Sequence, residues 1–225
     1  MQYKAVVFDR DLTLTYFNPE KDLWRDRMIS EWLGRPFVLQ PEAKREAFLR
    51  AGSNRWCRTV DEERAFYREV FRQMLISAGV TEQLERRTDV LFGELWCNFD
   101  RLLYPETVPV LDYFKSRGYR LGVLSDTCPS LRMTLEQLGI AHYFDSFVCC
   151  SIVGAHKPDP ILYEIALEEL GVSAAECIYI DDHPPAAEGA RAAGMASFLL
   201  DRTAERRVGW TASCLRDLID FVENP

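Results

Sequence analysis

Acidic side chains stand where two strands are expected to end. Asp9 and Asp11 follow the apolar run 3–8, and Asp181 and Asp182 follow the run 177–180. Two like unit charges roughly 4 Å apart repel by about 4 kcal/mol at an effective dielectric constant of about 20. A divalent cation removes this penalty, and carboxylate oxygens are ligands that Mg²⁺ prefers. The sequence therefore predicts a Mg²⁺ site.

Two further predicted strand ends carry groups that suit a phosphate. Ser125 and Asp126 follow the run 120–124, and Lys157 follows the run 147–150 after a short loop. Ligands of open parallel sheets bind at the carboxyl ends of the strands. We therefore assign Ser125, Asp126 and Lys157 to phosphate binding. Two alternatives stay open, since Lys157 alone reads as a surface residue and Ser125 as a helix N-cap.

The elements that must position these residues alternate between strand-like and helix-like segments. Short apolar runs of this kind suit strands that are covered on both faces. The alternation predicts an α/β fold, a Rossmann-like parallel sheet with helices on both faces. The expected strands are 3–8, 120–124, 147–150, 177–180 and 196–200, and the expected helices are 107–117, 129–138, 158–170 and 185–193.

A long helical segment interrupts this alternation after the first strand. Helical spacing of apolar residues predicts a small all-α domain over 17–100. The α/β core domain would then comprise residues 1–16 and 101–225. The helices expected in the inserted domain are 20–33, 41–51, 60–78 and 81–97.

Composition narrows the class of protein. The formal net charge of −8 argues against broad binding of nucleic acid, which depends on clustered lysine and arginine. The seven cysteines show no zinc-like spacing and are expected to be reduced and buried. The amino-terminal residues lack the apolar run of a signal peptide, and no apolar stretch is long enough to span a bilayer. We expect a cytoplasmic protein without a membrane or nucleic-acid partner.

Four motifs in order resemble those of the haloacid dehalogenase (HAD) superfamily. Val6–Thr13 is similar to its first motif, a strand that ends in Asp-x-Asp-x-Thr. Val123–Ser125 resembles the second motif and Lys157–Pro160 the third. Ile178–Asp182, followed by Glu188–Met195, resembles the fourth. The resemblance covers the core from residue 4 to about residue 200.

This resemblance implies a role for each residue. Asp9 would attack phosphorus and form an aspartyl-phosphate. Asp11 would protonate the leaving oxygen and later activate water. Asp9, the backbone carbonyl of Asp11, and Asp182 would hold Mg²⁺. Ser125 and Lys157 would bind the phosphoryl oxygens.

Two positions depart from the usual pattern of the superfamily. Position 12 is commonly glycine, but here it is Leu12, so we expect a right-handed turn after Asp11. The fourth motif often has another acid four residues after the metal ligand, where this chain has Ala186. We therefore assign the metal mainly to Asp182 and place Asp181 behind it, in contact with the ligands or with the metal through water.

The helical insertion resembles the cap domains that many members of the superfamily carry. Such caps close over the site and influence the choice of substrate. In the linker 52–58, Arg55, Trp56 and Arg58 would read an anionic or ring-containing substrate. The alternative is a solvated loop in which Trp56 packs into the cap.

Together these features predict a Mg²⁺-dependent phosphatase that hydrolyses a small phosphate monoester through an aspartyl-phosphate. Its partner would be a small phosphorylated metabolite, and the chain would be a monomer or a homodimer. A phosphomutase would share all four motifs and stays open. A dehalogenase is disfavoured by Asp11 and Asp182, because relatives with that activity lack the second aspartate and need no metal. A non-catalytic phospho-ligand binding protein is the alternative from another class.

Overall fold

The chain forms two compact units in a computed structural model that describes residues 2–53 and 55–224. The first unit consists of Met1–Phe17, Arg101–Thr127 and Leu131–Pro225. The second consists of Asn18–Asp100 together with the short segment Cys128–Ser130. The sequence predicted a helical domain over 17–100 and did not anticipate that residues 128–130 group with it.

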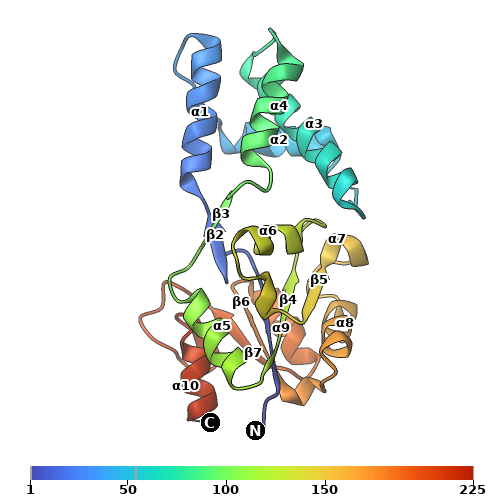
Figure 1. The fold of residues 1–225 in the computed structure, drawn as a ribbon, viewed down its shortest axis with the longest axis vertical. Coiled ribbons are helices and arrows are strands. Elements are labelled where there is room, and N and C mark those ends of the chain that lie inside the picture. The colour runs from blue at the N-terminus through green and yellow to red at the C-terminus, as the bar shows by residue number, and fades with distance from the viewer. Residues whose placement is uncertain (1, 54, 225) are drawn as a thin grey trace. The chain divides into compact units, whose positions relative to one another are not determined.

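The first unit is built on a six-stranded sheet in which every neighbouring pair is parallel (Figure 1). The strand order is β5-β4-β1-β6-β7-β8, so β1 lies between β4 and β6, the strands of the second and fourth predicted motifs. The predicted α/β fold with a Rossmann-like parallel sheet is confirmed. The strands are β1 (Ala5–Phe8), β4 (Arg120–Ser125), β5 (Ser146–Cys149), β6 (Cys177–Asp181), β7 (Ala196–Leu200) and β8 (Thr211–Ala212).

Alternating side chains of β1 point into two separate hydrophobic cores. Val6 and Phe8 belong to the core under one face, and Ala5 and Val7 belong to the core under the other. The first face is covered by α5, α6 and α10, and the second by α8 and α9 (Figure 1). These helices are α5 (Thr107–Ser116), α6 (Leu131–Gln137), α8 (Pro160–Leu170), α9 (Pro184–Ala192) and α10 (Asp217–Glu223).

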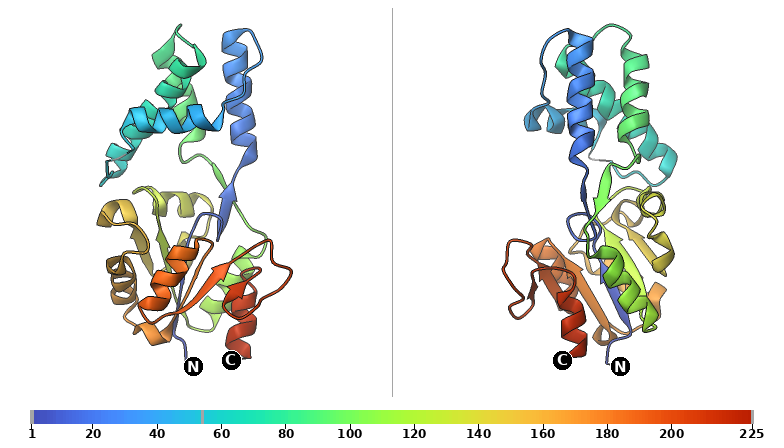
Figure 2. Two further views of the ribbon diagram at one scale, coloured as in Figure 1. Left: turned by 180° about the vertical axis from the view of Figure 1, so that it is seen from behind. Right: turned by 60° about the vertical axis from the view of Figure 1, so that its left-hand side comes forward.

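A second, two-stranded sheet lies where the chain leaves and re-enters the first unit. The strands β2 (Thr15–Phe17) and β3 (Arg101–Leu103) pair antiparallel, and Figure 2 shows them side by side. The sequence analysis did not predict them, because three residues are too few to show an alternating pattern.

Two expectations need correction, one on the end of β5 and one on the burial of the cysteines. Cys150 begins the short helix α7 (Cys150–Val153) instead of ending the strand as predicted. The expectation of buried cysteines holds for Cys149, Cys150 and Cys177, whereas the other four cysteines are partly exposed.

The second unit has its own hydrophobic core. Its helices are α1 (Pro19–Leu33), α2 (Pro41–Ala51), α3 (Val60–Ala78) and α4 (Leu84–Leu95). Ile29, Val70, Leu75 and Leu91 are fully buried among them. The helix α4 is shorter than the predicted 81–97. It begins later because Gln83 has a left-handed backbone, and it ends earlier because Trp96 is extended.

No helix among the residues that the structure describes is long and apolar enough to cross a membrane.

Candidate active site

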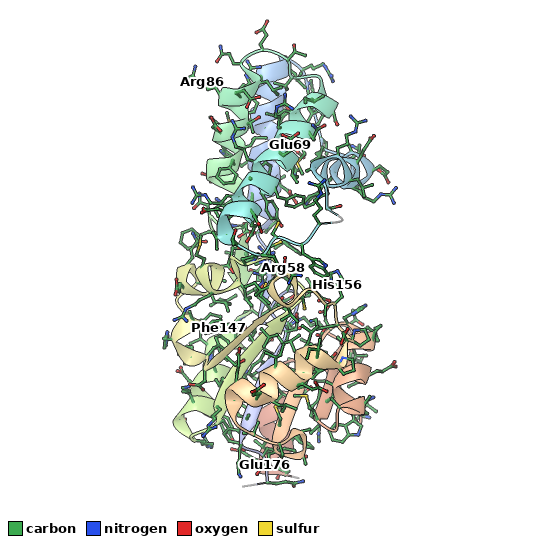
Figure 3. All side chains as sticks on the ribbon, turned by 90° about the vertical axis from the view of Figure 1, so that its right-hand side faces the viewer. Arg58, Glu69, Arg86, Phe147, His156 and Glu176 are labelled. Carbon is green, nitrogen blue, oxygen red and sulfur yellow. The ribbon has the colours of Figure 1, made fainter. Side chains whose placement is uncertain are left out.

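The predicted catalytic side chains gather at the carboxyl ends of the parallel strands. Asp9 directly follows β1, Ser125 is the last residue of β4, and Asp181 is the last residue of β6. Figure 3 shows His156, the neighbour of Lys157, at one end of the first unit and Glu176, which precedes β6, at the opposite end. The residues therefore meet at the edge where ligands of parallel sheets bind.

A buried ammonium group joins two of the carboxylates. Lys157 Nζ donates to Asp9 Oδ1 at 2.8 Å and to Asp181 Oδ2 at 2.7 Å. All three side chains are buried. Although burial disfavours its charged form, the adjacent Asp9 and Asp181 raise the pKa of Lys157, so the ammonium stays charged.

Asp181 holds Lys157 in place and is itself fixed by two further hydrogen bonds. Its Oδ2 also accepts a hydrogen bond from the Tyr179 hydroxyl at 2.6 Å, and its Oδ1 accepts one from the His183 N–H at 2.8 Å. Sequence reasoning missed Tyr179, although it lies two residues before Asp181 and therefore on the same face of the strand.

Three acidic side chains form a cluster that fits a cation. Asp9, Asp181 and Asp182 each offer a carboxylate oxygen, and these oxygens lie within 4.8 Å of one another. Lys157 offsets one of the three negative charges. Burial and the charge of Asp181 raise the pKa of the half-buried Asp182, as expected where carboxylates lack a counter-charge. A hard divalent cation with oxygen ligands would supply it.

Burial is the main cause of an unusual pKa at Asp9. It raises this pKa to about 7, with an opposing contribution from Lys157 and a smaller raising one from Asp181. In the metal-free protein, Asp9 therefore holds a proton more readily than an exposed aspartate does. A bound cation would favour the ionised form, which is the nucleophilic one.

Asp11 lies between two arginines that the sequence analysis did not single out. Arg10 Nε and Nη2 donate to it at 3.0 and 2.8 Å, and Arg101 Nε and Nη2 donate at 2.6 and 3.2 Å. Although burial opposes the shift, these two charges lower the pKa of Asp11 well below its usual range. Arg10 stands between Asp9 and Asp11 in the sequence, but nothing local marks Arg101, which is ninety residues away.

The turn after Asp11 contradicts the sequence prediction. Leu12 has a φ of +60°, which is left-handed and not right-handed as expected. Three hydrogen bonds hold this conformation: Leu12 N–H donates to the Thr15 carbonyl at 2.6 Å, and Arg202 donates to the carbonyls of Leu12 and Thr13 at 3.2 and 2.7 Å. These hydrogen bonds offset the steric cost of a positive φ at a bulky residue, which was the reason to expect a right-handed turn.

A family model described as haloacid dehalogenase-like hydrolase matches residues 3–194. The chain belongs to the haloacid dehalogenase-like hydrolases. The predicted resemblance is thus confirmed for most of the chain.

Relatives of this hydrolase include phosphatases. It is 29% identical over 223 residues, 93% of this chain and 92% of the other, to "Phosphatase MT3486" of Mycobacterium tuberculosis. It is 34% identical over 139 residues, 61% of this chain and 55% of the other, to a phosphoserine phosphatase of Thermus thermophilus.

Among solved structures, the 2-haloacid dehalogenase of Pseudomonas syringae pv. Tomato DC3000 matches with a TM-score of 0.69 and 23% identity, over 98% of both chains. At this identity the structural match concerns the fold alone.

Ser125 and Asp126, the other two residues predicted to bind phosphate, lie outside the hydrogen bonds that join Lys157 to Asp9 and Asp181. Ser125 is buried as the last residue of β4, and its contact with a phosphate stays a prediction. The Asp126 carboxylate accepts a hydrogen bond from the Lys157 N–H at 3.2 Å and so fixes the loop that carries Lys157. Because an ionised carboxylate has no proton to donate, Asp126 would bind a phosphate only through its backbone N–H.

The residues predicted to read the substrate lie in a loop of the helical unit. Arg55, Trp56 and Arg58 are exposed between α2 and α3, and their neighbour Asn54 is outside the described residues. Arg58 N–H donates to the Glu62 carboxylate at 2.6 Å, next to the capping box that begins α3. Their role in substrate recognition stays a prediction.

Proposed function

We propose that this hydrolase is a Mg²⁺-dependent phosphatase that removes the phosphoryl group from a small phosphate monoester. The observation that carries the proposal is the buried trio of Asp9, Lys157 and Asp181 beside Asp182. It offers a carboxylate nucleophile, an ammonium for the phosphoryl oxygens and a carboxylate cluster that needs a cation. The relative that matches 93% of the chain bears the name of a phosphatase.

The protein's own groups divide the work as follows. Asp9, the backbone carbonyl of Asp11 and Asp182 would hold Mg²⁺, with Asp181 positioned behind them. Bound there, the cation supplies the positive charge that lets a phosphate dianion approach a carboxylate. Lys157 and Ser125 bind and orient the phosphoryl oxygens.

The reaction proceeds in two steps. Asp9 Oδ forms a bond to phosphorus as the bond to the leaving oxygen breaks, and protonated Asp11 gives its proton to that oxygen. Ionised Asp11 then takes a proton from water, whose oxygen attacks phosphorus and releases inorganic phosphate and the Asp9 carboxylate. Between both arginines Asp11 is ionised but is a weak base. Both steps therefore require its carboxylate to leave at least one arginine, which would raise its pKa.

The test is a panel of phosphate monoesters, with 4-nitrophenyl phosphate as the generic member and 2-chloropropionate as the dehalogenase substrate. We expect phosphate release with Mg²⁺, no release with a chelator, and no chloride release. Chloride release without phosphatase activity would replace the proposal with a dehalogenase. Phosphoryl transfer to a second sugar phosphate instead of water would indicate a phosphomutase.

A further inference from the structure

Arg202, which follows β7, supports the turn after Asp11 through two backbone oxygens. Its Nε donates to the Leu12 carbonyl at 3.2 Å, and its Nη2 donates to the Thr13 carbonyl at 2.7 Å. Leu12 lies between Asp11 and Thr13 with a φ of +60°, a conformation that a bulky side chain disfavours. One rigid guanidinium plane therefore fixes two successive carbonyls of a turn that is sterically costly.

Two further contacts fix the Arg202 side chain itself. Its Nη1 donates to Glu106 Oε1 at 2.7 Å, and its guanidinium carbon lies 3.3 Å from the centre of the Tyr104 ring. The side chains of Arg202 and Glu106 are both partly buried. Because the ion pair and the ring hold the guanidinium in one orientation, Arg202 presents its other two donors to the turn in a fixed geometry.

The conformation of Leu12 sets the direction of the Asp11 carbonyl. The two residues share one planar trans peptide unit, in which the C=O of Asp11 points opposite to the N–H of Leu12. That N–H donates to the Thr15 carbonyl at 2.6 Å, so the Asp11 carbonyl points away from Thr15. Leu12 and Arg202 also line the same cavity as Asp182, a member of the carboxylate cluster. The turn and its support therefore adjoin the proposed cation site.

We propose that Arg202 is a positioning residue for the cation site, because it keeps Leu12 left-handed and thereby holds the Asp11 carbonyl in the direction needed to bind Mg²⁺. The inference rests on the proposed function, in which this carbonyl is a ligand. Glycine adopts a positive φ without steric cost, so a glycine at position 12 would need less support. In this chain, Arg202 supplies the support that the bulky Leu12 requires.

Mg²⁺ affinity tests this role, because charge and geometry predict opposite changes in it. Arg202→Met removes both donors to the turn together with one positive charge. The loss of a positive charge beside a cation site should by itself strengthen Mg²⁺ binding. If Arg202 positions the Asp11 carbonyl, binding should instead weaken by about tenfold or more, as for other groups that orient metal ligands. Calorimetric titration of each folded protein with Mg²⁺ measures the change.

A double-mutant cycle with Leu12→Gly shows whether the effect acts through the turn. In the Leu12→Gly background, the left-handed conformation no longer carries the steric cost that Arg202 offsets. Arg202→Met should therefore weaken Mg²⁺ binding by only about threefold or less in that background. A residue that contributed only to overall stability would show no such dependence on position 12.

Arg120 provides the matched control, since it also supports a left-handed residue. It begins β4, at the edge of the sheet opposite the site, and its Nη1 donates to the carbonyls of Leu170 and Gly171. Gly171 has a φ of +60°, as Leu12 does. Arg120→Met should therefore keep the wild-type affinity for Mg²⁺.

A second substitution guards against misfolding of Arg202→Met. Arg202→Lys keeps a positive charge for Glu106 but cannot present a planar fork to two carbonyls. It should weaken Mg²⁺ binding in the same direction, and again less when position 12 is glycine. Circular dichroism on all variants verifies that they are folded.

Three results would overturn the positioning role while leaving the proposed function intact. They are wild-type affinity in the Arg202 variants, a loss that is equally large with Leu12 and with glycine at position 12, and an equal loss in Arg120→Met. In each of these cases the wild type still binds Mg²⁺ and releases phosphate from 4-nitrophenyl phosphate. If the wild type did neither, the proposed function would fail together with the inference.

Discussion

Asp9 is the proposed nucleophile, and protons and Mg²⁺ should compete for its carboxylate. Burial raises the pKa of Asp9 to about 7 in the metal-free protein, so below that pH the folded chain carries a proton that a cation must displace. Mg²⁺ binding should therefore weaken as pH falls, by up to about tenfold per pH unit below about pH 7. Calorimetric titration with Mg²⁺ between about pH 5.5 and about pH 8 measures this change. An affinity independent of pH would contradict a raised pKa of Asp9 that is coupled to metal binding.

Tyr179 positions Lys157 indirectly, through Asp181. Tyr179→Phe removes the donor that lies 2.6 Å from Asp181 Oδ2 and leaves a buried carboxylate with one partner fewer. We expect a loss of about 1.5–3 kcal/mol in the free energy of unfolding, as for hydrogen bonds to charged groups. Urea denaturation measures it.

Tyr163→Phe is the matched control for that change. The Tyr163 hydroxyl donates to the neutral carbonyl of Ala186 at 2.8 Å, so its loss should cost only about 0.5–1.5 kcal/mol. Equal costs for the two substitutions would mean that Tyr179 does not support a charged group.

At the scale of elements, Gly189 lets α9 approach the loop and helix that follow Lys157. A Cβ atom at Gly189 would lie 2.5 Å from the Pro158 Cβ and 2.8 Å from the Tyr163 hydroxyl. Gly189→Ala should therefore destabilise the fold by about 1–3 kcal/mol, as overpacking does. Thermal unfolding measures the change.

Gly93, unlike Gly189, is a helical glycine with room for a side chain. It lies in α4, and a Cβ atom there would have no neighbour within 4 Å. Gly93→Ala should stabilise the protein by about 0.5–1 kcal/mol through its helix propensity. If Gly189→Ala were as harmless as Gly93→Ala, the close approach of α9 would not be a constraint.

The sequence predicted those elements whose patterns are long enough to read. The apolar runs of β1, β4 and β6 and the helical spacing of α2 and α3 match the structure closely. The strands β2 and β3 are too short for such a pattern, and the turn at Leu12 depends on hydrogen bonds from a residue far along the chain.

Site residues that a local pattern marks could be predicted, whereas a residue that reaches the site through a distant contact could not. The places of Asp9 and Asp182 could be predicted because each stands just beyond a strand end. Lys157 lies farther on, after β5 and the short helix α7, and the Lys-Pro motif marked it. Tyr179 has a local signal, because it lies two residues before Asp181 and therefore on the same face of β6. Arg101 could not be predicted, because its contact with Asp11 exists only once β2 and β3 pair.

For the whole molecule, metal binding should appear as added stability. A ligand that binds only the folded state at about one hundred times its dissociation constant adds about 2.7 kcal/mol. We expect Mg²⁺ to raise the unfolding temperature of the wild type but to have little effect on Asp182→Asn, which lacks a carboxylate of the cluster. An equal rise in both proteins would place the cation elsewhere.

The central claim is that Asp9 carries the phosphoryl group. The most direct measurement is mass spectrometry of the protein quenched in acid during turnover of 4-nitrophenyl phosphate with Mg²⁺. We predict one added phosphoryl group on the peptide that contains Asp9, and neither the adduct nor turnover in a folded Asp9→Asn variant. Turnover that persists in Asp9→Asn, or a phosphoryl group on another residue, would contradict the account.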